Sequence, residues 1–467
     1  MSGGGTVEVL TAAEAEPAQR RTAGALLASG LRSGDRVAFC LPSSAALLCA
    51  VLGALRIGVV PVLLNATLLD DERDALVADA APGLVVTDRD ALDALDGGPP
   101  ADLSPYPLAR PMHYTSGTTG RSKGVWSGVW SATDAAAAFA DEADLWSFGS
   151  DDVHLVCSPM YHSVSVRFAG GTLLRGGTCV VLGRFDAEVA RDLLVGGRGP
   201  VPTTTFMAPA AMGRLLATVA GTEERFGTLR LLVHAGSPCP PSLKRSAMSR
   251  VDPGVLWEFY GSTEGQFTVC SPEEWSAHPG TVGRARPGRV LTVDDDGTIW
   301  CRPPGFAGFR YWGDDAKTGE AWREGAFTVG DLGRIDADGY LYLDGRRDDL
   351  IITGGVNVYP AEVEAALAGV DGVAEIAVFG MDDDRWGQRV CAAVVITGRD
   401  WGSGTSPAGD RVGAAVLAAV GAHAESHLAA YKRPKQYSVV DALPRTATGK
   451  VRRNLIPDLL GGPPEPG

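Results

Sequence analysis

The segment from Thr115 to Gly124 has a composition suited to binding a polyanion. It reads Thr-Ser-Gly-Thr-Thr-Gly-Arg-Ser-Lys-Gly, with three glycines, five hydroxyl side chains, two cations and no apolar residue for a core. Glycines let a backbone approach a ligand closely, and N–H groups, hydroxyls and Lys123 can contact phosphate oxygens. We therefore predict a loop that binds a nucleotide triphosphate; the alternative is a flexible surface loop. Ser122 stands where the P-loop motif requires its second glycine, so a P-loop NTPase is excluded.

The same segment contains a pattern found in hydrolases. Residues 120–124 satisfy G-x-S-x-G, which in α/β-hydrolases lies between a strand and a helix. Here a Thr/Gly loop precedes the pattern, and the extended-looking residues 125–127 follow it. Two flanking charges also suit a phosphate better than an ester pocket. The hydrolase interpretation is therefore disfavoured, and it would require turnover without ATP.

Four other segments combine loop-like composition with side chains that can do chemistry. In the segment 260–265, after an apolar strand, Glu264 could meet a Mg²⁺ ion bound mainly by phosphate oxygens. Asp331 ends an apolar run and could hold two ribose hydroxyls. Residues 345–349 and 443–450 are charged segments near a domain boundary and near the C-terminus. Each segment alone also fits an ordinary surface role.

The elements that must position these segments alternate between short strands and Ala-rich helices. Residues 37–64 read as a buried strand, helix and strand, and similar units continue to His234. This alternation predicts an α/β fold: a large N-terminal domain (1–347) of mostly parallel sheets flanked by helices, with a β-rich subdomain after residue 291. A small, mobile α+β C-terminal domain (348–467) follows, which includes a helix over Val412–Ala430.

Composition restricts the partners and the compartment. The 467-residue chain has a formal charge of −14, which argues against nucleic acid or an anionic membrane as the main partner. Its eight cysteines show no metal-ligand spacing and lie mostly in apolar runs, as in a reduced cytoplasmic protein. No signal peptide or membrane span is expected, since the apolar stretch 37–64 is interrupted by Pro42, Arg56 and Pro61.

Further segments complete a recognisable set of motifs: Pro159–Ser163, His234–Ser237, Gly280–Arg284 and Ile351–Pro360. In this order the chain resembles the adenylate-forming (AMP-binding) superfamily of acyl-CoA and aryl-CoA synthetases, peptide-synthetase adenylation domains and luciferases. The resemblance covers nearly the whole chain and favours the acyl-CoA/aryl-CoA synthetase branch. It implies an AMP-forming acid–thiol ligase, in which a carboxylate attacks the α-phosphorus of ATP and a thiol then displaces AMP. Catalysis of such a transfer depends mainly on positioning and charge neutralisation.

The resemblance implies roles for residues around the nucleotide. Lys450, His162 and Glu264 would be catalytic, with Lys450 between the carboxylate and the α-phosphate, and Glu264 and Thr118 would bind Mg²⁺. Tyr260 would stack on adenine, Asp331 would hold the ribose and Arg346 would reach ribose or phosphate. The implied ATP/AMP site comprises Thr115, Ser116, Gly117, Thr118, Thr119, Gly120, Lys123, Gly236, Ser237, Tyr260, Gly261, Thr263, Asp331 and Arg346.

The resemblance also implies a domain rotation and two substrate channels. The small domain would turn about Asp348 as a hinge, which requires a residue free to change φ and ψ. Its loop would then line a tunnel for the pantetheine of coenzyme A, through Gly354, Gly355, Asn357 and Tyr359. The acyl pocket would include Tyr161, Arg167 and His234.

Two departures from the family pattern concern the N-terminal part. The N-terminus and the loop near 96–111 are shorter than usual, so the edge of the large domain is expected to be reshaped. Arg167 stands in a helix that normally lines the acyl pocket with apolar or small residues. A buried charge requires a partner. Either Arg167 points outward or pairs with a structural carboxylate, or it faces the pocket and meets a polar or anionic group of the substrate.

We therefore predict an ATP- and Mg²⁺-dependent carboxylate–CoA ligase acting on an aromatic or functionalised acid, as a monomer or homodimer. The alternatives keep the adenylation step but use a carrier-protein thiol or an amine as acceptor, or activate nitrite for arylamine diazotisation. A catalytically silent binding protein is a further alternative, disfavoured because the implied residues are all present.

Overall fold

The computed structural model describes residues 6–115, 123–346, 349–353, 356–383, 386–397, 407–445 and 451–460, with the side chains of residues 346, 357 and 407–411 excluded. The chain divides into two compact units. The first comprises Met1–Thr292, Trp300–Val329 and Asp336–Leu341, and the second comprises Val293–Ile299, Gly330–Ile335 and Tyr342–Gly467. The domain boundary expected at 347/348 stays a prediction.

Two six-stranded sheets form the first unit. One has the order β1-β8-β7-β9-β10-β11, and all neighbours are parallel except β1 with β8. The other has the order β16-β6-β5-β3-β2-β4, in which β4, β2, β3 and β5 are parallel and β6 and β16 are antiparallel additions. The bounds are β1 (Val7–Thr11), β2 (Arg36–Phe39), β3 (Val60–Leu63), β4 (Leu84–Val86), β5 (Met112–Thr115), β6 (Lys123–Trp126), β7 (Val153–Val156), β8 (Thr178–Leu182), β9 (Thr204–Met207), β10 (Leu231–His234), β11 (Leu256–Glu258) and β16 (Arg310–Tyr311).

Helices connect these strands and begin at capping residues. Ser44 Oγ accepts from the Leu47 N–H at 3.1 Å, and Ser131 Oγ accepts from the Asp134 N–H at 3.1 Å, so both helices start with a satisfied donor. The helices of this unit are α1 (Ala12–Ala28), α2 (Ala45–Arg56), α3 (Asp70–Ala80), α4 (Arg89–Leu95), α5 (Ala132–Trp146), α6 (Ser163–Leu174), α7 (Ala187–Leu194), α8 (Pro209–Thr218), α9 (Pro241–Arg250), α10 (Pro272–Ala277) and α11 (Asp315–Ala321).

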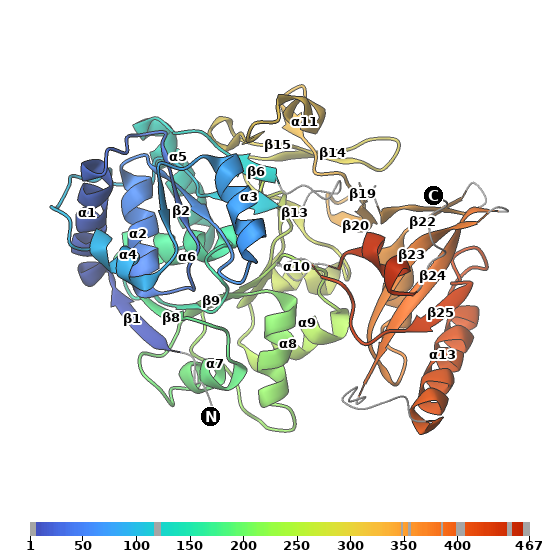
Figure 1. Cartoon of the computed structure of the whole chain (residues 1–467). Helices are drawn as coiled ribbons and strands as arrows, with labels where there is room; N and C mark the ends of the chain where they lie inside the picture. Colours follow the sequence, from blue (N-terminus) through green and yellow to red (C-terminus); the bar gives the residue numbers. More distant parts are fainter. Residues whose placement is uncertain are drawn as a thin grey trace. The chain divides into compact units, whose positions relative to one another are not determined.

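The largest apolar core joins the two sheets. It takes residues from β2 and β3 of one sheet, from β7 and β8 of the other, and from α2 and α6. Figure 1 shows α1, α2 and α4 side by side against the sheet that contains β2. Helix α2 is almost wholly buried, which explains its nearly continuous apolar sequence. The predicted strand–helix–strand unit over 37–64 and the α/β fold are confirmed.

Short antiparallel pieces complete the first unit. Strands β15, β18 and β17 pair in that order, and β12 pairs with β13. This agrees with the β-rich region expected after residue 291. The bounds are β12 (Thr268–Val269), β13 (Arg284–Ala285), β14 (Val290–Val293), β15 (Ile299–Arg302), β17 (Trp322–Arg323), β18 (Ala326–Phe327) and the 3₁₀ turn η1 (Gly305–Ala307).

The second unit is a small α+β structure. Its main sheet runs β22-β21-β24-β23, with β25 parallel to β24, and α13 packs beside β24 and β25 (Figure 1). Helix α13 confirms the helix predicted over 412–430. The bounds are β19 (Asp331–Ile335), β20 (Leu341–Arg346), β21 (Ile351–Thr353), β22 (Val356–Val358), β23 (Val373–Asp383), β24 (Gly387–Ile396), β25 (Gln436–Val439), α12 (Pro360–Leu367), α13 (Pro407–His427), α14 (Ile456–Leu459) and the 3₁₀ turn η3 (Arg453–Leu455).

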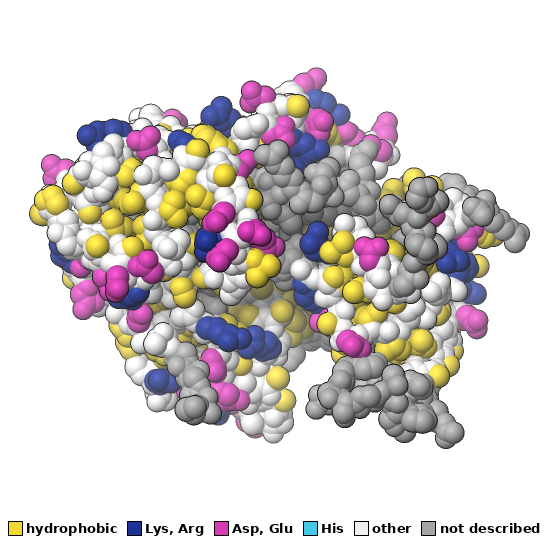
Figure 2. Space-filling view, in the orientation of Figure 1, with side chains coloured by type: hydrophobic (Ala, Val, Ile, Leu, Met, Phe, Trp, Pro, Cys, Tyr) yellow, Lys and Arg dark blue, Asp and Glu magenta, His cyan; other side chains and the backbone are white. Residues whose placement is uncertain are grey.

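The burial of most cysteines agrees with the sequence-based expectation that they are small core residues. The face seen in Figure 2 carries acidic and basic side chains intermixed among the coloured residues, without a continuous basic patch there. All eight cysteines are free thiols, and six of them are buried. Within the described ranges, no helix combines the length and apolar character needed to cross a bilayer.

Candidate active site

Two paired strands hold the ends of the predicted phosphate loop. Thr115 ends β5 and lies opposite Lys123, which begins β6. Ser116, Gly117, Thr118, Thr119 and Gly120 lie outside the described residues. Gly124 belongs to β6, where an added Cβ would lie 2.2 Å from Met112 Cε, so a side chain there would require Met112 to shift. Because a strand and not a helix follows the G-x-S-x-G pattern, the structure lacks the context of a hydrolase nucleophile.

The segment after β11 forms a tight turn that directs Glu264 inward. The Ser262 N–H donates to the Gly265 carbonyl at 2.8 Å, and an added Cβ at Gly261 would lie 2.8 Å from the same oxygen. Glu264 is only 6% exposed, and its Oε1 accepts from the Tyr311 hydroxyl at 2.9 Å. The ring of Tyr260 packs on that of Phe267, with centroids 4.8 Å apart.

Tyr311 connects the phosphate loop with Glu264. It lies on β16, which pairs with β6, and the Lys123 ammonium lies 5.3 Å from its ring centroid while its hydroxyl contacts Glu264. The structure thus brings together a cation and a carboxylate that are far apart in the sequence. Tyr311 was not predicted from the sequence. Its place in an aromatic stretch, residues 309–312, is a weak signal at best.

His234 ends β10, and Gly236, two residues later, adopts a φ of +92°. The imidazole is fully buried, and its Nε2 lies 3.9 Å from Glu258 Oε2, which also pairs with Lys244. Burial and the charge of Lys244 lower the pKa of His234 to about 3, so the ring is neutral at physiological pH. His234 and Tyr161 do not line the cavity described below, so their predicted place in the acyl pocket stays a prediction. Ser237 follows Gly236 and is exposed.

A buried histidine beside the Tyr161-His162 motif was missed by the sequence analysis. His162 precedes α6 as its N-cap residue, with its ring 4.6 Å from that of Tyr161. His113 Nδ1 lies 2.9 Å from the Tyr161 carbonyl oxygen, which can only accept, so Nδ1 carries the proton. Burial lowers the pKa of His113 to about 3. Its Nε2 is therefore an acceptor, and no described residue bonds to it.

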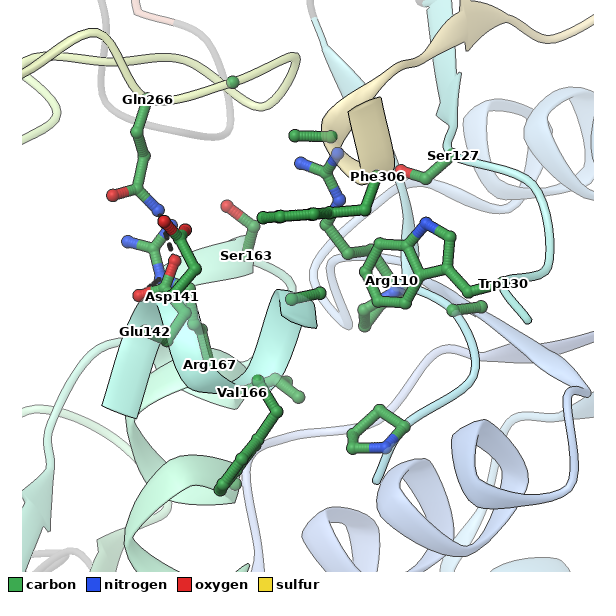
Figure 3. Close-up of a pocket in the computed structure, with 18 of the residues that line it drawn as sticks. Arg110, Ser127, Trp130, Asp141, Glu142, Ser163, Val166, Arg167, Gln266 and Phe306 are labelled. Carbon is green, nitrogen blue, oxygen red and sulfur yellow. Dashed lines mark hydrogen bonds and ion pairs between the residues drawn. The ribbon is translucent and has the colours of Figure 1, made fainter. Parts of the chain in front are cut away.

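A cavity of about 160 Å³ lies beside these motifs. Val125, Thr263 and Gly265 from the motif segments line it, together with His113 and with apolar residues of α2, α5 and α6. Its charged and amide lining residues are Arg110, Asp141, Glu142, Arg167, Gln266 and Arg289. Figure 3 shows Asp141, Glu142 and Arg167 gathered on one side of the pocket, with Arg110 and Trp130 on the other.

Arg167 has a carboxylate partner and also lines the cavity, while its predicted contact with the substrate stays a prediction. It lines the cavity, and its Nε lies 3.5 Å from Glu142 Oε2. Burial alone would raise the pKa of Glu142, but the charges of Arg167 and Arg286 lower it to about 2. The other charged residues of this cluster were not predicted. Arg286 follows the predicted motif Gly280–Arg284, and Asp141-Glu142 interrupts an Ala-rich helix; both are signals that could have been weighed.

The predicted residues of the second unit lie in three places. Asp331 begins β19, directly after Gly330 with a φ of +80°. Arg346 ends β20, and Asn357 on β22 lies opposite Ile352 on β21. The side chains of Arg346 and Asn357 are not among those described. Tyr359 precedes α12 as its N-cap residue. Asp348, Gly354, Gly355 and Lys450 lie outside the described residues.

The low pKa values of three buried histidines predict that the free energy of unfolding falls in mild acid. Burial lowers the pKa of His113 and His234 to about 3 and that of His154 to about 4, below the value of about 6.5 in an unfolded chain. The unfolded state therefore binds more protons as the pH falls below about 6.5, and the stability present above that pH is lost progressively toward 3–4. Each histidine should contribute a loss of about 2 kcal/mol at pH 5.

Chemical denaturation at pH 7.5 and pH 5.0 measures this effect. A His154→Gln variant removes one titrating group, so its free energy of unfolding should fall less between the two pH values, by about 2 kcal/mol. Equal pH dependence in the wild type and the variant would contradict the assignment of His154 as a buried neutral group.

Comparison with known families identifies the class of protein. The sequence profile of the AMP-binding enzyme family matches residues 4–106 and 110–308, and that of the AMP-binding enzyme C-terminal domain matches residues 362–450. The chain belongs to the AMP-binding enzyme family. The predicted membership of the adenylate-forming superfamily is confirmed.

The chain is similar over nearly its whole length to characterised ligases. It is 31% identical over 471 residues to the 2-succinylbenzoate–CoA ligase of Geobacillus sp. (strain WCH70), covering 92% of this chain and 89% of the relative. It is 32% identical over 491 residues to the fatty acid–[acyl-carrier-protein] ligase ScoC of Streptomyces coeruleorubidus, covering 95% of this chain and 90% of the relative. The solved structure of O-succinylbenzoate coenzyme A synthetase (MenE) from Bacillus subtilis, in complex with ATP and magnesium ion, has a TM-score of 0.77 at 26% identity and covers 95% of this chain and 93% of that one.

Proposed function

We propose that the protein is an ATP- and Mg²⁺-dependent, AMP-forming carboxylate–CoA ligase for an aromatic or otherwise functionalised acid. One observation carries the proposal: Lys123 and Glu264 meet at Tyr311, and their neighbours Val125 and Thr263 line the cavity. The proposed phosphate-binding segment therefore lies next to the cavity that we propose as the acid pocket. The chemistry of the relatives, which are CoA and carrier-protein ligases, supports the same reading. Eight free thiols are compatible with a cytoplasmic location.

Glu264 has the properties of a Mg²⁺ ligand. One carboxylate oxygen accepts from Tyr311, which orients the group and leaves the second oxygen available. In the described part of the chain no cluster of three or more His, Cys, Asp or Glu residues could hold a metal by itself. This donor set suits Mg²⁺, which keeps several waters and binds through few carboxylates together with phosphates. When bound, the ion would neutralise charge on the phosphates; Thr118 is the second proposed ligand.

The reaction has two displacements. A carboxylate oxygen of the acid forms a bond to the α-phosphorus of ATP, and the bond from that phosphorus to pyrophosphate breaks. The thiolate of coenzyme A then attacks the acyl carbon, and AMP leaves with the electrons of the carbon–oxygen bond. We propose that Lys123 and the Thr115–Gly120 loop hold the β- and γ-phosphates, Tyr260 stacks on adenine, and Lys450 neutralises charge at the reacting phosphate.

The remaining predicted residues complete the proposal. Gly236 and Ser237 lie beside adenine, Asp331 holds the ribose hydroxyls, Arg346 reaches ribose or phosphate, and His162 is a catalytic residue. The C-terminal domain (348–467) turns about Asp348, and the Gly354–Tyr359 segment then receives pantetheine. A cavity of about 160 Å³ matches the size that admits one benzene ring, which favours a single-ring acid over a long saturated chain.

ATP–pyrophosphate exchange tests the first displacement. Benzoic, arylacetic, cinnamic, amino-substituted and fatty acids are supplied singly, with nitrite as an additional substrate. Exchange that depends on one class of organic acid is expected, with ring-containing acids preferred. Exchange with nitrite alone, or with no compound at all, would overturn the proposed function.

A further inference from the structure

The cavity of the first unit contains more positive than negative charge. Arg110, Arg167 and Arg289 line it, and Arg286 lies behind it with 1% of its side chain exposed. Against these four cations the lining offers two carboxylates, Asp141 and Glu142. The cluster therefore has a formal charge of +2.

Both carboxylates are already occupied by neighbouring donors. Asp141 Oδ2 accepts from Arg286 at 2.7 Å and from Arg289 at 2.8 Å. Glu142 accepts from Arg286 at 3.0 Å, Gln266 at 2.8 Å and Trp146 at 3.1 Å. Arg286 and Arg289 hydrogen-bond to these carboxylates, whereas Arg167 approaches Glu142 without a hydrogen bond, so the cluster keeps a surplus of positive charge.

Arg110 and Arg167 retain unused donors. The Nε and Nη2 atoms of both are buried, and none of the four has a hydrogen-bond acceptor among the residues described. Arg167 Nε approaches Glu142 only as an ion pair at 3.5 Å. The aromatic faces of Phe259, at 5.1 Å from Arg167, and Trp130, at 5.8 Å from Arg110, offset part of the cost of burying a guanidinium.

Both guanidiniums are charged at neutral pH. Burial, and next the charge of Arg167, lower the pKa of Arg110 only to about 10. Burial also lowers the pKa of Arg167, which the charge of Glu142 partly counteracts. An oxyanion that entered the cavity would be the acceptor that these donors lack, and charge-assisted bonds to arginine are among the strongest in proteins.

We propose that the acid activated by this enzyme carries a second anionic group, such as a second carboxylate, and that Arg110 and Arg167 bind that group in the cavity. The inference rests on the proposed function and specifies its substrate class. The reacting carboxylate lies toward Thr263 and Gly265, the part of the lining next to Glu264. The second group lies between Arg110 and Arg167, which face the pocket from two sides (Figure 3). An acid without that group leaves two buried cations unneutralised.

Matched pairs of acids test this assignment without altering the protein. Carboxyphenylacetic and benzenedicarboxylic acids are compared in pyrophosphate exchange with their monomethyl esters and with phenylacetic and benzoic acids. The dianions should exceed their partners in kcat/KM by about 10- to 100-fold, as expected for hydrogen bonds to a charged group. Equal rates with dianions and matched monoanions would overturn the inference and leave the ligase assignment intact. If none of the acids supported exchange, the ligase assignment itself would be rejected.

Substitutions test whether Arg110 and Arg167 cause the preference for a dianionic acid. Arg167→Met and Arg110→Met should raise the KM for the dianion by a larger factor than the KM for the monoanion, whereas Arg167→Lys should recover part of the preference for the dianion. Arg198→Met, at an exposed position in the turn after α7, is the matched control and should change neither. A rise in the KM for ATP that is equal with every acid would assign the arginines to the nucleotide phosphates and contradict the proposal.

Discussion

Lys450→Ala is expected to lower the kcat/KM of ATP–pyrophosphate exchange on the order of 10²- to 10³-fold, the effect of removing one preorganised donor from developing charge. The resemblance implies that this lysine lies between the carboxylate and the α-phosphate, where negative charge concentrates during the first displacement. Its loss should leave the free energy of unfolding nearly unchanged. Lys435→Ala, an exposed lysine of the same unit, is the matched control.

The second displacement provides an independent check of the same residue. If rotation of the C-terminal domain (348–467) withdraws Lys450 before the thiol attacks, the variant should convert an added acyl-adenylate and coenzyme A to thioester at a rate close to that of the wild type. Normal exchange in Lys450→Ala would show that the family role does not apply here. Equal loss of both displacements would contradict the withdrawal of the lysine.

Arg286→Met is expected to lower the free energy of unfolding by about 3–5 kcal/mol, the usual effect of removing one partner of a buried ion pair. Arg286 is 1% exposed and donates to both Asp141 and Glu142, besides contacting Gln266. Without it, two carboxylates lose their shared donor inside the core. Urea unfolding at pH 7.5 measures the change, with Arg89→Met as control because Arg89 pairs with Asp93 on the surface.

Measuring the free energy of unfolding as the pH is lowered distinguishes the ion pairs of Arg286 with Asp141 and Glu142 from apolar packing. The low pKa of Glu142 means that its ionised form stabilises the fold above the ordinary value of about 4.5, and that this contribution disappears as the pH falls toward 2. In Arg286→Met the pKa of Glu142 should rise toward 4.5, so the stability lost between pH 4.5 and pH 2 should become smaller. A variant as stable as the wild type, with an unchanged acid transition, would show that the network contributes little.

The elements of the fold were largely predictable because local patterns determine them. The strand–helix–strand unit predicted over 37–64 is present as β2, α2 and β3, since apolar periodicity and the Ser44 cap act within a few residues. The motif segments also lie at strand ends, as expected for an α/β protein. Ser116–Gly120 and Lys450 are outside the described residues, so their roles stay predictions.

The charged side of the cavity could not be predicted in the same way. It joins Arg110, before β5, with Asp141 of α5 and Arg286 after β13. Periodicity can indicate that Asp141 lies on a particular face of its helix, but it cannot say that an arginine 145 residues away will meet it there. Of these charged residues, we predicted only Arg167 for the pocket, because it interrupts a helix otherwise made of small and apolar residues.

Product analysis with coenzyme A tests directly whether the protein is an AMP-forming carboxylate–CoA ligase. The protein is incubated with ATP, Mg²⁺, coenzyme A and the acid that best supports exchange, and AMP and the thioester are quantified together by mass spectrometry. A carrier protein bearing phosphopantetheine replaces coenzyme A in a parallel reaction. We expect one AMP for each acyl-CoA thioester formed, with no product when ATP or the acid is omitted. Release of AMP without a thioester to coenzyme A would contradict it, and transfer to the carrier protein alone would assign the acceptor instead.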